Sequence, residues 1–328
     1  MRIKGIFLQP NYQDTLILNK DDNIVFIVGS PRSGTTLLGN ILDNHELISQ
    51  WYEPYFIFDK FFRNAEDDVR SSNEATQKVC MQIRKDFKRY GNKKRSRIIV
   101  DKSPRNSLKI PFIRKIFPKA KFIHIIRDGR DATLSINKEW IRRRRIVHGA
   151  EGFSEFNYLD ALKVIKEWLN RQPFWFDRIK ALWFEMHGHL INKSKQLNQK
   201  RWNGQVGWGP RFNNWSEYLS LNSLLQFNAL QWVQCVANVN SNWSLLDENQ
   251  GIQIQYEELI VNPTEHLENV LHFIDVVPTH EFFNTLPKLK SSNFCKWKNE
   301  FSIQEIEGIK PILNPLLKEF GYTKLYPW

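Results

Sequence analysis

The sequence is poor in cysteine and has no long hydrophobic run before Gly29. Its 328 residues contain three cysteines, Cys80, Cys235 and Cys295, which lie far apart. An odd number of isolated cysteines is poor material for a disulfide framework or a zinc site, so we expect a reducing compartment. The segment before Gly29 mixes charged and apolar residues, and it holds neither a signal-peptide core nor a run long enough to cross a membrane. These absences predict a cytoplasmic protein without a membrane span.

The charge balance is strongly basic. There are 47 lysines and arginines against 35 aspartates and glutamates, which leaves a net charge of +12 at pH 7. Such a surface favours anionic partners, for example a nucleotide, a lipid headgroup or a sulfated polymer. The basic residues are spread along the chain, without the repeat of arginine and aromatic residues that is typical of a nucleic-acid track. We therefore expect an anionic ligand and no nucleic acid.

The length and pattern of the chain favour one large α/β domain. Short apolar runs typical of buried strands alternate with stretches whose apolar residues recur at helical spacing. No internal repeat or low-complexity linker divides the chain. We predict a P-loop-type parallel sheet flanked by helices, in a single domain over residues 1–328. An inserted helical cap is predicted at approximately residues 146–242.

The sequence GSPRSGTT at residues 29–36 has the form of a phosphate-binding loop. It follows an apolar run at 24–28 that is typical of a buried strand, and it precedes a helical pattern at 37–42. In such a loop, consecutive backbone N–H groups and the positive end of the helix dipole point at one anion. Its two glycines have the spacing of a Walker A loop. An ordinary strand-to-helix turn with Ser33 as its N-cap is the alternative.

The loop differs from a Walker A loop at one charged position. Thr35 stands where the lysine of that loop would reach the β- and γ-phosphates, and a cation occurs instead inside the loop, at Arg32. A kinase or NTPase without that lysine lacks its main charge for stabilising γ-phosphoryl transfer. The loop is therefore predicted to hold a phosphate without hydrolysing a triphosphate.

Two candidate reactive side chains lie near the ends of expected strands. Glu53 is flanked by aromatic residues and by Pro54. Burial beside aromatic rings would raise its pKa and suit it to accept a proton, whereas an ordinary loop carboxylate is the alternative. Lys102 follows the apolar run at 98–100, at the carboxyl end of a strand, where the ligands of open α/β sheets gather.

A second strand-to-helix corner follows the strand predicted at 121–126. Arg127 lies at the end of this strand, and Ser135 lies further along the helical pattern that comes next. A cation and a hydroxyl at such a corner can hold a second phosphate by charge-assisted hydrogen bonds. A turn cross-linked by its own arginine–aspartate pairs is the alternative. His124, inside the strand, is expected to be a core histidine.

Together these motifs resemble those of sulfotransferases that use 3′-phosphoadenosine 5′-phosphosulfate (PAPS). GSPRSGTTLL at residues 29–38 is similar to the 5′-phosphosulfate signature of that family, and FIHIIRDGRDATLS at 122–135 is similar to its 3′-phosphate signature. IQYEEL at 254–259 and KWKNEF at 296–301 resemble its Tyr-Glu-x-Leu and Lys-Trp segments. The motif pattern is most similar to the bacterial and protein-tyrosine sulfotransferase-like branch.

The resemblance implies transfer of a sulfuryl group from PAPS to an acceptor hydroxyl or amine, by in-line displacement and without a metal ion. It also implies that Glu53 is the base, and that Arg32 and Lys102 stabilise the charge that develops as the sulfuryl group moves. The residues that it implies for binding of the donor are Arg32, Ser33, Gly34, Thr35, Thr36, Arg127, Ser135, Tyr256 and Lys296.

Two other classes of protein are alternatives. A P-loop nucleotide kinase would require a lysine at position 35, which is a threonine here. A non-catalytic polyanion- or nucleotide-binding protein on the same scaffold would be expected to lack Glu53 and Lys102, and both are present.

The sequence leaves the acceptor and the oligomeric state open. A small molecule, a lipid headgroup, a carbohydrate and a peptide tyrosine are all compatible acceptors. The tryptophans at positions 202, 208, 215 and 232 would either stack on a flat acceptor or pack the predicted cap. The arginine run at 142–145 either steers an acidic acceptor or forms a solvated helix face.

Overall fold

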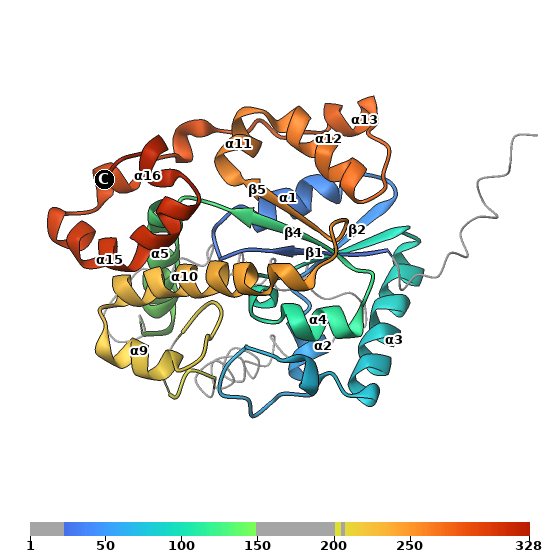
Figure 1. Ribbon diagram of the computed structural model, residues 1–328, viewed down its shortest axis with the longest axis horizontal. Helices are drawn as coiled ribbons and strands as arrows, with labels where there is room; N and C mark the ends of the chain where they lie inside the picture. The colour runs from blue at the N-terminus through green and yellow to red at the C-terminus, as the bar shows by residue number, and fades with distance from the viewer. Residues whose placement is uncertain (1–22, 149–200, 205–206) are drawn as a thin grey trace, which may run out of the picture.

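A five-stranded sheet lies at the centre of the computed structural model, which describes residues 23–148, 201–204 and 207–328. The strand order is β2-β3-β1-β4-β5 (Figure 1). All four pairs of neighbouring strands are parallel, which confirms the predicted sheet. The strands are β1 (Ile24–Val28), β2 (Ile48–Tyr52), β3 (Ile98–Lys102), β4 (Lys121–Ile126) and β5 (Gly251–Gln255).

Helices flank the sheet on both sides. Three of them follow strands and carry residues of the site described below: α1 (Thr35–Leu42) after β1, α5 (Gly129–His148) after β4, and α11 (Tyr256–Val261) after β5. The other α-helices within the described residues are α2 (Tyr55–Asp59), α3 (Gln77–Lys94), α4 (Ile110–Ile116), α9 (Trp215–Leu221), α10 (Leu224–Asn242), α12 (Pro263–Phe273), α13 (His280–Asn284), α14 (Trp297–Glu300), α15 (Ile303–Glu319) and α16 (Tyr322–Leu325). The short 3₁₀ helices in the same ranges are η2 (Ser72–Glu74), η3 (Pro104–Leu108), η4 (Trp243–Leu245) and η5 (Ser291–Asn293).

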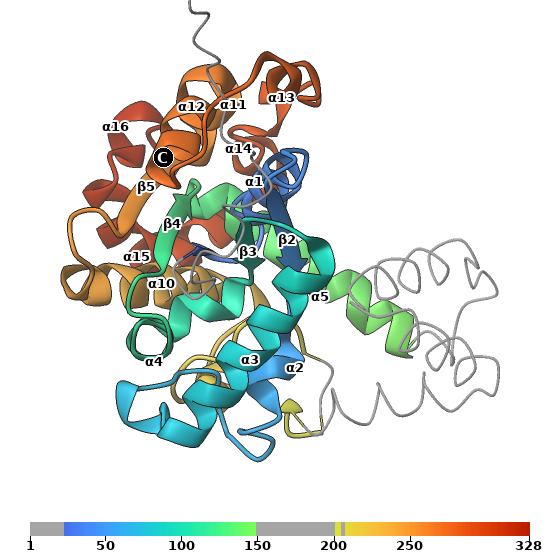
Figure 2. The same ribbon diagram turned by 90° about the vertical axis from the view of Figure 1, so that its right-hand side faces the viewer.

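The central strand β1 is buried on both of its faces. Val25 and Ile27 belong to an apolar cluster with residues of α1, α11 and α12. Phe26 belongs to a different cluster, with residues of α3 and α4. Figures 1 and 2 show α1 and α12 on one side of the sheet and α4 on the other. A parallel strand covered on both faces needs apolar residues throughout, which is why this run does not alternate with polar residues.

A third apolar cluster joins α5, α10 and α15. Trp202, Trp215 and Trp232 are buried in it, whereas Trp208 is partly buried at its edge. Three of the four tryptophans considered for acceptor stacking therefore pack a core. Within the predicted cap, residues 149–200 lie outside the described residues, so the boundaries of the cap stay a prediction.

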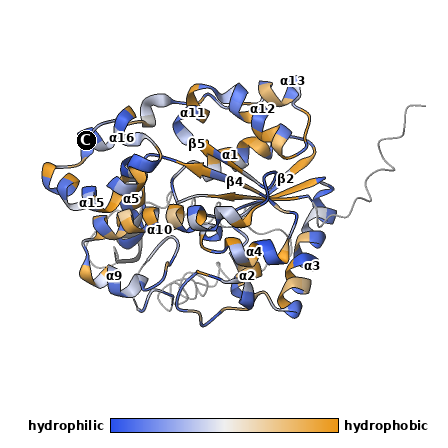
Figure 3. Cartoon of the chain, in the orientation of Figure 1, coloured by the Kyte–Doolittle hydropathy of each residue, from blue (hydrophilic) through white to orange (hydrophobic). Residues whose placement is uncertain are grey.

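The distribution of apolar residues follows the layers of the fold. Figure 3 shows apolar residues along the strands and a mixture of polar and apolar residues on the surrounding helices. Among the helices in the described ranges, none combines the length and the apolar character that a membrane span requires.

Candidate functional site

The loop between β1 and α1 is shaped by two glycines. Gly29 and Gly34 have φ angles of 149° and 94°, which glycine adopts more readily than other residues. A Cβ atom added to Gly29 would lie 2.4 Å from the backbone oxygen of Ile125, and one added to Gly34 would lie 2.4 Å from Cδ2 of Tyr256. The absence of side chains at these two positions lets the loop pack directly on β4 and on the start of α11.

Hydrogen bonds from η3 hold the backbone of this loop. The N–H of Gly29 donates to Oγ of Ser107 at 2.8 Å, and the Ser107 hydroxyl donates to the oxygen of Gly29 at 3.0 Å. The hydroxyls of Ser30 and Ser33 contact each other at 2.7 Å. Gly34, and not Ser33, is the N-cap residue of α1, and no side chain caps the helix there. The first N–H groups of α1 can therefore bind an anion.

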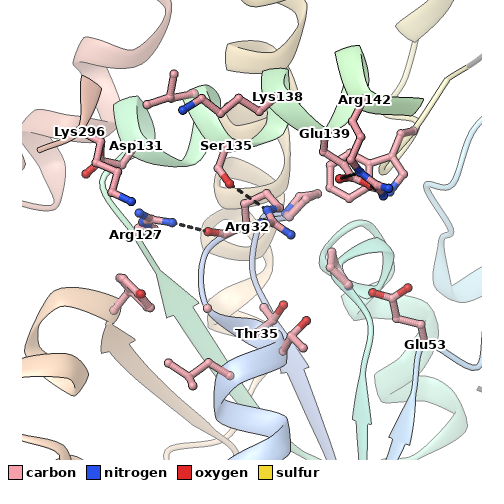
Figure 4. A pocket seen from close by; sticks show the side chains of 18 of the residues that line it. Arg32, Thr35, Glu53, Arg127, Asp131, Ser135, Lys138, Glu139, Arg142 and Lys296 are labelled. Carbon is pink, nitrogen blue, oxygen red and sulfur yellow. Dashed lines mark hydrogen bonds and ion pairs between the residues drawn. The ribbon is translucent and has the colours of Figure 1, made fainter. Parts of the chain in front are cut away.

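Four side chains from three motifs, Arg32, Arg127, Ser135 and Tyr256, meet beside the loop (Figure 4). Nε of Arg32 donates to Oγ of Ser135 at 2.9 Å. Nη1 of Arg127 donates to the backbone oxygen of Arg32 at 3.0 Å. The guanidinium of Arg127 also lies 4.8 Å from the ring centre of Tyr256, within the range of a cation–π contact. The corner after β4 is thus in direct contact with the loop after β1.

A cavity of about 690 Å³ adjoins these side chains. Six cationic and three carboxylate side chains line it, so its charge favours an anionic ligand. In the part of the chain that the structure describes, no group of three or more histidine, cysteine, aspartate or glutamate residues could hold a metal ion. The lining residues are Pro31, Arg32, Gly34, Thr35, Thr36, Leu37, Tyr52, Glu53, Pro104, Arg127, Asp131, Leu134, Ser135, Lys138, Glu139, Arg142, Arg143, Trp208, Tyr256 and Lys296.

The cavity has two ends, which we name after one residue each. Arg32 and Ser135 lie between them (Figure 4). The Arg127 end comprises Arg127, Asp131, Tyr256 and Lys296. The Glu53 end comprises Glu53, Glu139, Arg142, Arg143 and Trp208.

The residues predicted from the sequence gather around this one cavity, with two exceptions. Of the predicted donor-binding residues, Ser33 does not line it and is fully buried behind the loop. Of the predicted catalytic residues, Arg32 and Glu53 line it and Lys102 does not. His124 is fully buried in β4, as expected for a core histidine, and burial lowers its pKa to about 3.

Lys102 contacts Glu53, which lines the cavity. Its Nζ lies 2.7 Å from Oε1 of Glu53 and 3.7 Å from the ring centre of Tyr52. The lysine side chain is fully buried, whereas that of Glu53 is 14% exposed. Glu53 has a φ angle of 44°, in the left-handed region that costs free energy for a residue other than glycine. Its N–H donates to the backbone oxygen of Lys102 at 3.1 Å, which helps to hold this conformation.

The sequence alone did not assign a role to Glu139. At the Glu53 end of the cavity, its carboxylate pairs with Arg142 and Arg143. Arg142 donates to both of its carboxylate oxygens at 2.9 and 2.7 Å, and Arg143 donates to one of them at 2.6 Å. Burial alone would raise the pKa of Glu139, but these two arginines hold it below the usual value. The guanidinium of Arg143 lies 5.5 Å from the ring centre of Trp208. The spacing of three and four residues between Glu139 and the arginines is the sequence signal for these pairs.

The fold and the cavity define a class of protein. A parallel α/β sheet with an uncapped helix N-terminus behind a glycine loop, and with cations from a second corner facing the same cavity, is an anion-binding site of the phosphate-loop type. Residues 24–182 match the family model described as the sulfotransferase family. This stretch of the chain is similar to the sulfotransferase family, which confirms the predicted resemblance.

Several known proteins with similar sequences are protein-tyrosine sulfotransferases. The chain is 30% identical over 167 residues to protein-tyrosine sulfotransferase 1 of Danio rerio, which covers 46% of this chain and 44% of the relative. It is 28% identical over 173 residues to protein-tyrosine sulfotransferase 1 of Homo sapiens, which covers 48% of this chain and 43% of the relative. The chain thus spans less than half the length of either relative.

A solved structure shares the fold over most of the chain. The sulfotransferase domain of the olefin synthase from Synechococcus PCC 7002 superposes with a TM-score of 0.51 at 14% sequence identity. The match covers 91% of this chain and 94% of that domain. The likeness therefore extends beyond the part of the chain that the sequence comparisons align.

Proposed function

We propose that the protein transfers a sulfuryl group from PAPS to an acceptor hydroxyl or amine. The observation that carries the proposal is the arrangement of two cationic corners, at Arg32 and Arg127, around one cavity of about 690 Å³. A ligand with a phosphosulfate at one end and a separate phosphate at the other matches two such corners better than a linear triphosphate does. The family match of residues 24–182 supports the same reaction class.

The donor is proposed to lie along the loop, with its 3′-phosphate at the Arg127 end. The backbone N–H groups of residues 34–36, at the N-terminus of α1, would bind the 5′-phosphate, whereas the N–H of Ser33 donates to the backbone oxygen of Ser30 at 3.3 Å. Arg127 and Ser135 would bind the 3′-phosphate by charge-assisted hydrogen bonds. Tyr256 and Lys296, which line the same end, would contact this phosphate or the nucleoside.

The chemical step is a displacement at sulfur. The acceptor oxygen or nitrogen attacks the sulfur, the bond from sulfur to the bridging oxygen breaks, and adenosine 3′,5′-bisphosphate leaves. Glu53 takes the proton of the acceptor, and Arg32 stabilises the negative charge that collects on the bridging oxygen. Lys102, at 2.7 Å from Glu53, orients this carboxylate and brings a positive charge close to the reacting groups.

The alternative functions have less support from the cavity. A nucleotide kinase lacks its loop lysine here, because the position holds Thr35. A non-catalytic binding protein has no need of a carboxylate in a strained conformation, and Glu53 has a φ angle of 44° beside the cavity. The acceptor is proposed to be a small molecule, a lipid headgroup or a carbohydrate, and the cytoplasmic location stays a prediction.

Ligand binding tests the donor, and transfer of label tests the reaction. Thermal unfolding is measured with adenosine 3′,5′-bisphosphate, AMP, ATP with Mg²⁺, and heparin. We expect the bisphosphate to raise Tm more than AMP or ATP does, because at equal concentrations the ligand that binds the folded state more tightly stabilises it more. An increase of Tm with ATP and Mg²⁺ that equals or exceeds the increase with the bisphosphate would contradict the proposal. An increase with heparin and none with the bisphosphate would also contradict it.

The second arm uses [³⁵S]PAPS with a panel of acceptors that covers phenols, sugars, lipid headgroups and tyrosine peptides. Label on an acceptor identifies its class. A protein that binds the bisphosphate yet labels none of these classes would point to the non-catalytic alternative.

A further inference from the structure

Asp131, in the first turn of α5, holds the segment that carries Lys296. The N–H of Cys295 donates to one of its carboxylate oxygens at 2.7 Å, and the N–H of Trp297 donates to the other at 3.1 Å. Only 2% of Asp131 is exposed. The two hydrogen bonds therefore fix the backbone on either side of Lys296, and Lys296 itself lines the cavity.

The backbone of this segment needs such a support. Cys295 has a φ angle of 54°, a left-handed conformation that costs free energy for a residue with a side chain. Hydrogen bonds from N–H groups to a carboxylate are stronger than those to a neutral acceptor. Two of them, at the residues on either side of Lys296, stabilise a conformation that the segment would otherwise leave.

A second set of contacts supports the segment from the C-terminal part of the chain. Arg130, fully buried, pairs with Asp128 at 2.6 Å. Its guanidinium lies 4.3 Å from the ring centre of Trp297 and 4.9 Å from that of Trp328, and it donates to the backbone oxygen of Tyr326 at 2.7 Å. The arginine–aspartate pair of this corner thus does form, but it faces the C-terminal helices, whereas Arg127 faces the loop.

Both oxygens of Asp131 are used by the segment, although the residue lines the cavity. A carboxylate beside a bound phosphate would repel it, so this residue is poorly suited to bind an anionic ligand directly. Burial raises the pKa of Asp131, and the N–H of Trp297 opposes that effect. Figure 4 shows Asp131, Arg127 and Lys296 at the same end of the cavity.

We propose that Asp131 is a positioning residue that fixes the backbone of residues 295–297, so that Lys296 faces the cavity beside Arg127. On the basis of the proposed function, Asp131 thereby determines how strongly the site prefers a ligand with a second phosphate. The carboxylate acts through Lys296 and does not touch the donor.

The first test measures the backbone directly and needs no ligand. In Asp131→Asn the amide side chain can accept one hydrogen bond through its oxygen, and its NH₂ group faces the second N–H. We expect hydrogen exchange of the peptide that contains residues 295–297 to become about tenfold faster, while exchange in β1 and β4 stays unchanged. Unchanged exchange at 295–297 would overturn the proposal, whether or not the protein binds PAPS.

The second test is a double-mutant cycle on ligand affinity. Asp131→Asn is expected to weaken binding of adenosine 3′,5′-bisphosphate about tenfold and binding of AMP less than about twofold. In the Lys296→Ala variant, adding Asp131→Asn should lower the affinity for either ligand less than about twofold, because the effect of Asp131 on binding depends on the Lys296 side chain. If Asp131→Asn lowers the affinity for the bisphosphate equally with and without Lys296→Ala, Asp131 does not act through Lys296 and the proposal is wrong.

Glu257→Gln provides a matched control for loosening of the same corner. Glu257 is a buried carboxylate that accepts from the N–H of Asp128 at 3.1 Å and from the hydroxyl of Tyr322 at 2.8 Å, so it faces the C-terminal helices. This variant should lower Tm but leave the ratio of bisphosphate to AMP affinity within about twofold. A change of that ratio as large as in Asp131→Asn would mean that any loosening has the same effect, which would overturn the specific role.

If the unsubstituted protein binds no bisphosphate, the proposed function fails and hydrogen exchange alone decides whether Asp131 holds the segment. If it binds the bisphosphate but Asp131→Asn changes neither exchange nor affinity, the positioning role fails and the proposed function stands.

Discussion

The two ends of the cavity are built in different ways. At the Arg127 end, Arg127 follows β4 and Tyr256 follows β5, so adjacent strands of a parallel sheet bring these side chains to one edge. At the Glu53 end, Glu53 follows the edge strand β2, and the remaining side chains are held by ion pairs and by contact with Trp208. Sheet topology therefore sets the first end, whereas side-chain pairing sets the second.

We expect the residues of the two ends to differ in how easily they can be replaced without loss of the structure of the site. Arg127 follows β4, an interior strand of the sheet in which five of six residues are buried, so its position changes little unless the sheet moves. Ion pairs on the surface of a helix contribute little to stability and can be exchanged at small cost. We infer that the Arg127 end is the fixed part of the site, which suits a donor common to a family, and that the Glu53 end is the part in which acceptor preference can vary.

The largest effect is expected for Arg32, which lies between the two ends. Arg32→Ala removes the cation that we propose to face the bridging oxygen, and kcat should fall about 10³- to 10⁵-fold with every acceptor. Steady-state transfer from [³⁵S]PAPS measures this loss. Arg114→Ala is the control, because Arg114 pairs with the exposed Asp247 and does not line the cavity. Turnover of Arg32→Ala near that of the control would rule out the central role of Arg32.

Glu53→Gln should separate the two ends by the step that fails. Glutamine can still accept a hydrogen bond from Lys102, but it cannot take a proton from the acceptor, so kcat should fall about 10²- to 10⁴-fold. The dissociation constant of adenosine 3′,5′-bisphosphate, measured by calorimetry, should stay within about twofold, because we propose that the 3′-phosphate binds at the other end. If donor affinity falls together with kcat, Glu53 supports the structure of the site and is not its base.

Arg127→Ala should produce the opposite pattern. Loss of a charge-assisted hydrogen bond to the 3′-phosphate should weaken binding of the bisphosphate about 10- to 100-fold. AMP lacks this phosphate, so its affinity should change much less, and the ratio of the two dissociation constants is the informative quantity. An equal loss for both ligands would place the contact of Arg127 elsewhere on the nucleotide.

The Arg127 end could be predicted from the sequence because its residues sit in continuous motifs. The corner after the strand at 121–126, which carries Arg127, contains a buried run, a turn and a helix start within a few residues, and the adjoining loop at 29–36 has the same form. Local sequence therefore carries both the fold and the side chains of this end. The contacts of Asp131 could not be predicted from the sequence. Its partners are the backbone N–H groups of residues 295 and 297, and every residue except proline has such a group, so the sequence holds no signal for them.

The Glu53 end could be predicted only in part. Lys102 is buried against Glu53 because β2 and β3 pair in the register that places Tyr52 opposite Lys102, and that register depends on a strand order that the sequence does not state. The spacing of Glu139 and its arginines is visible in the sequence, but the direction in which they face depends on how α5 packs. Trp208 joins them from a distant loop, so no local pattern connects these residues.

The smallest effect is expected from Glu139→Gln, and it tests whether the Glu53 end can vary. This change removes the negative charge that pairs Arg142 and Arg143. These arginines are 41% and 34% exposed, so solvent screens the pairs and the loss of folding stability should be small. Their positive charge is then less neutralised and attracts an anionic acceptor more strongly, so the KM of anionic acceptors should fall about two- to fivefold relative to neutral ones. Affinity for adenosine 3′,5′-bisphosphate should not change. A loss of donor affinity after this substitution would show that the two ends are coupled, and it would remove the distinction between a fixed and a variable part of the site.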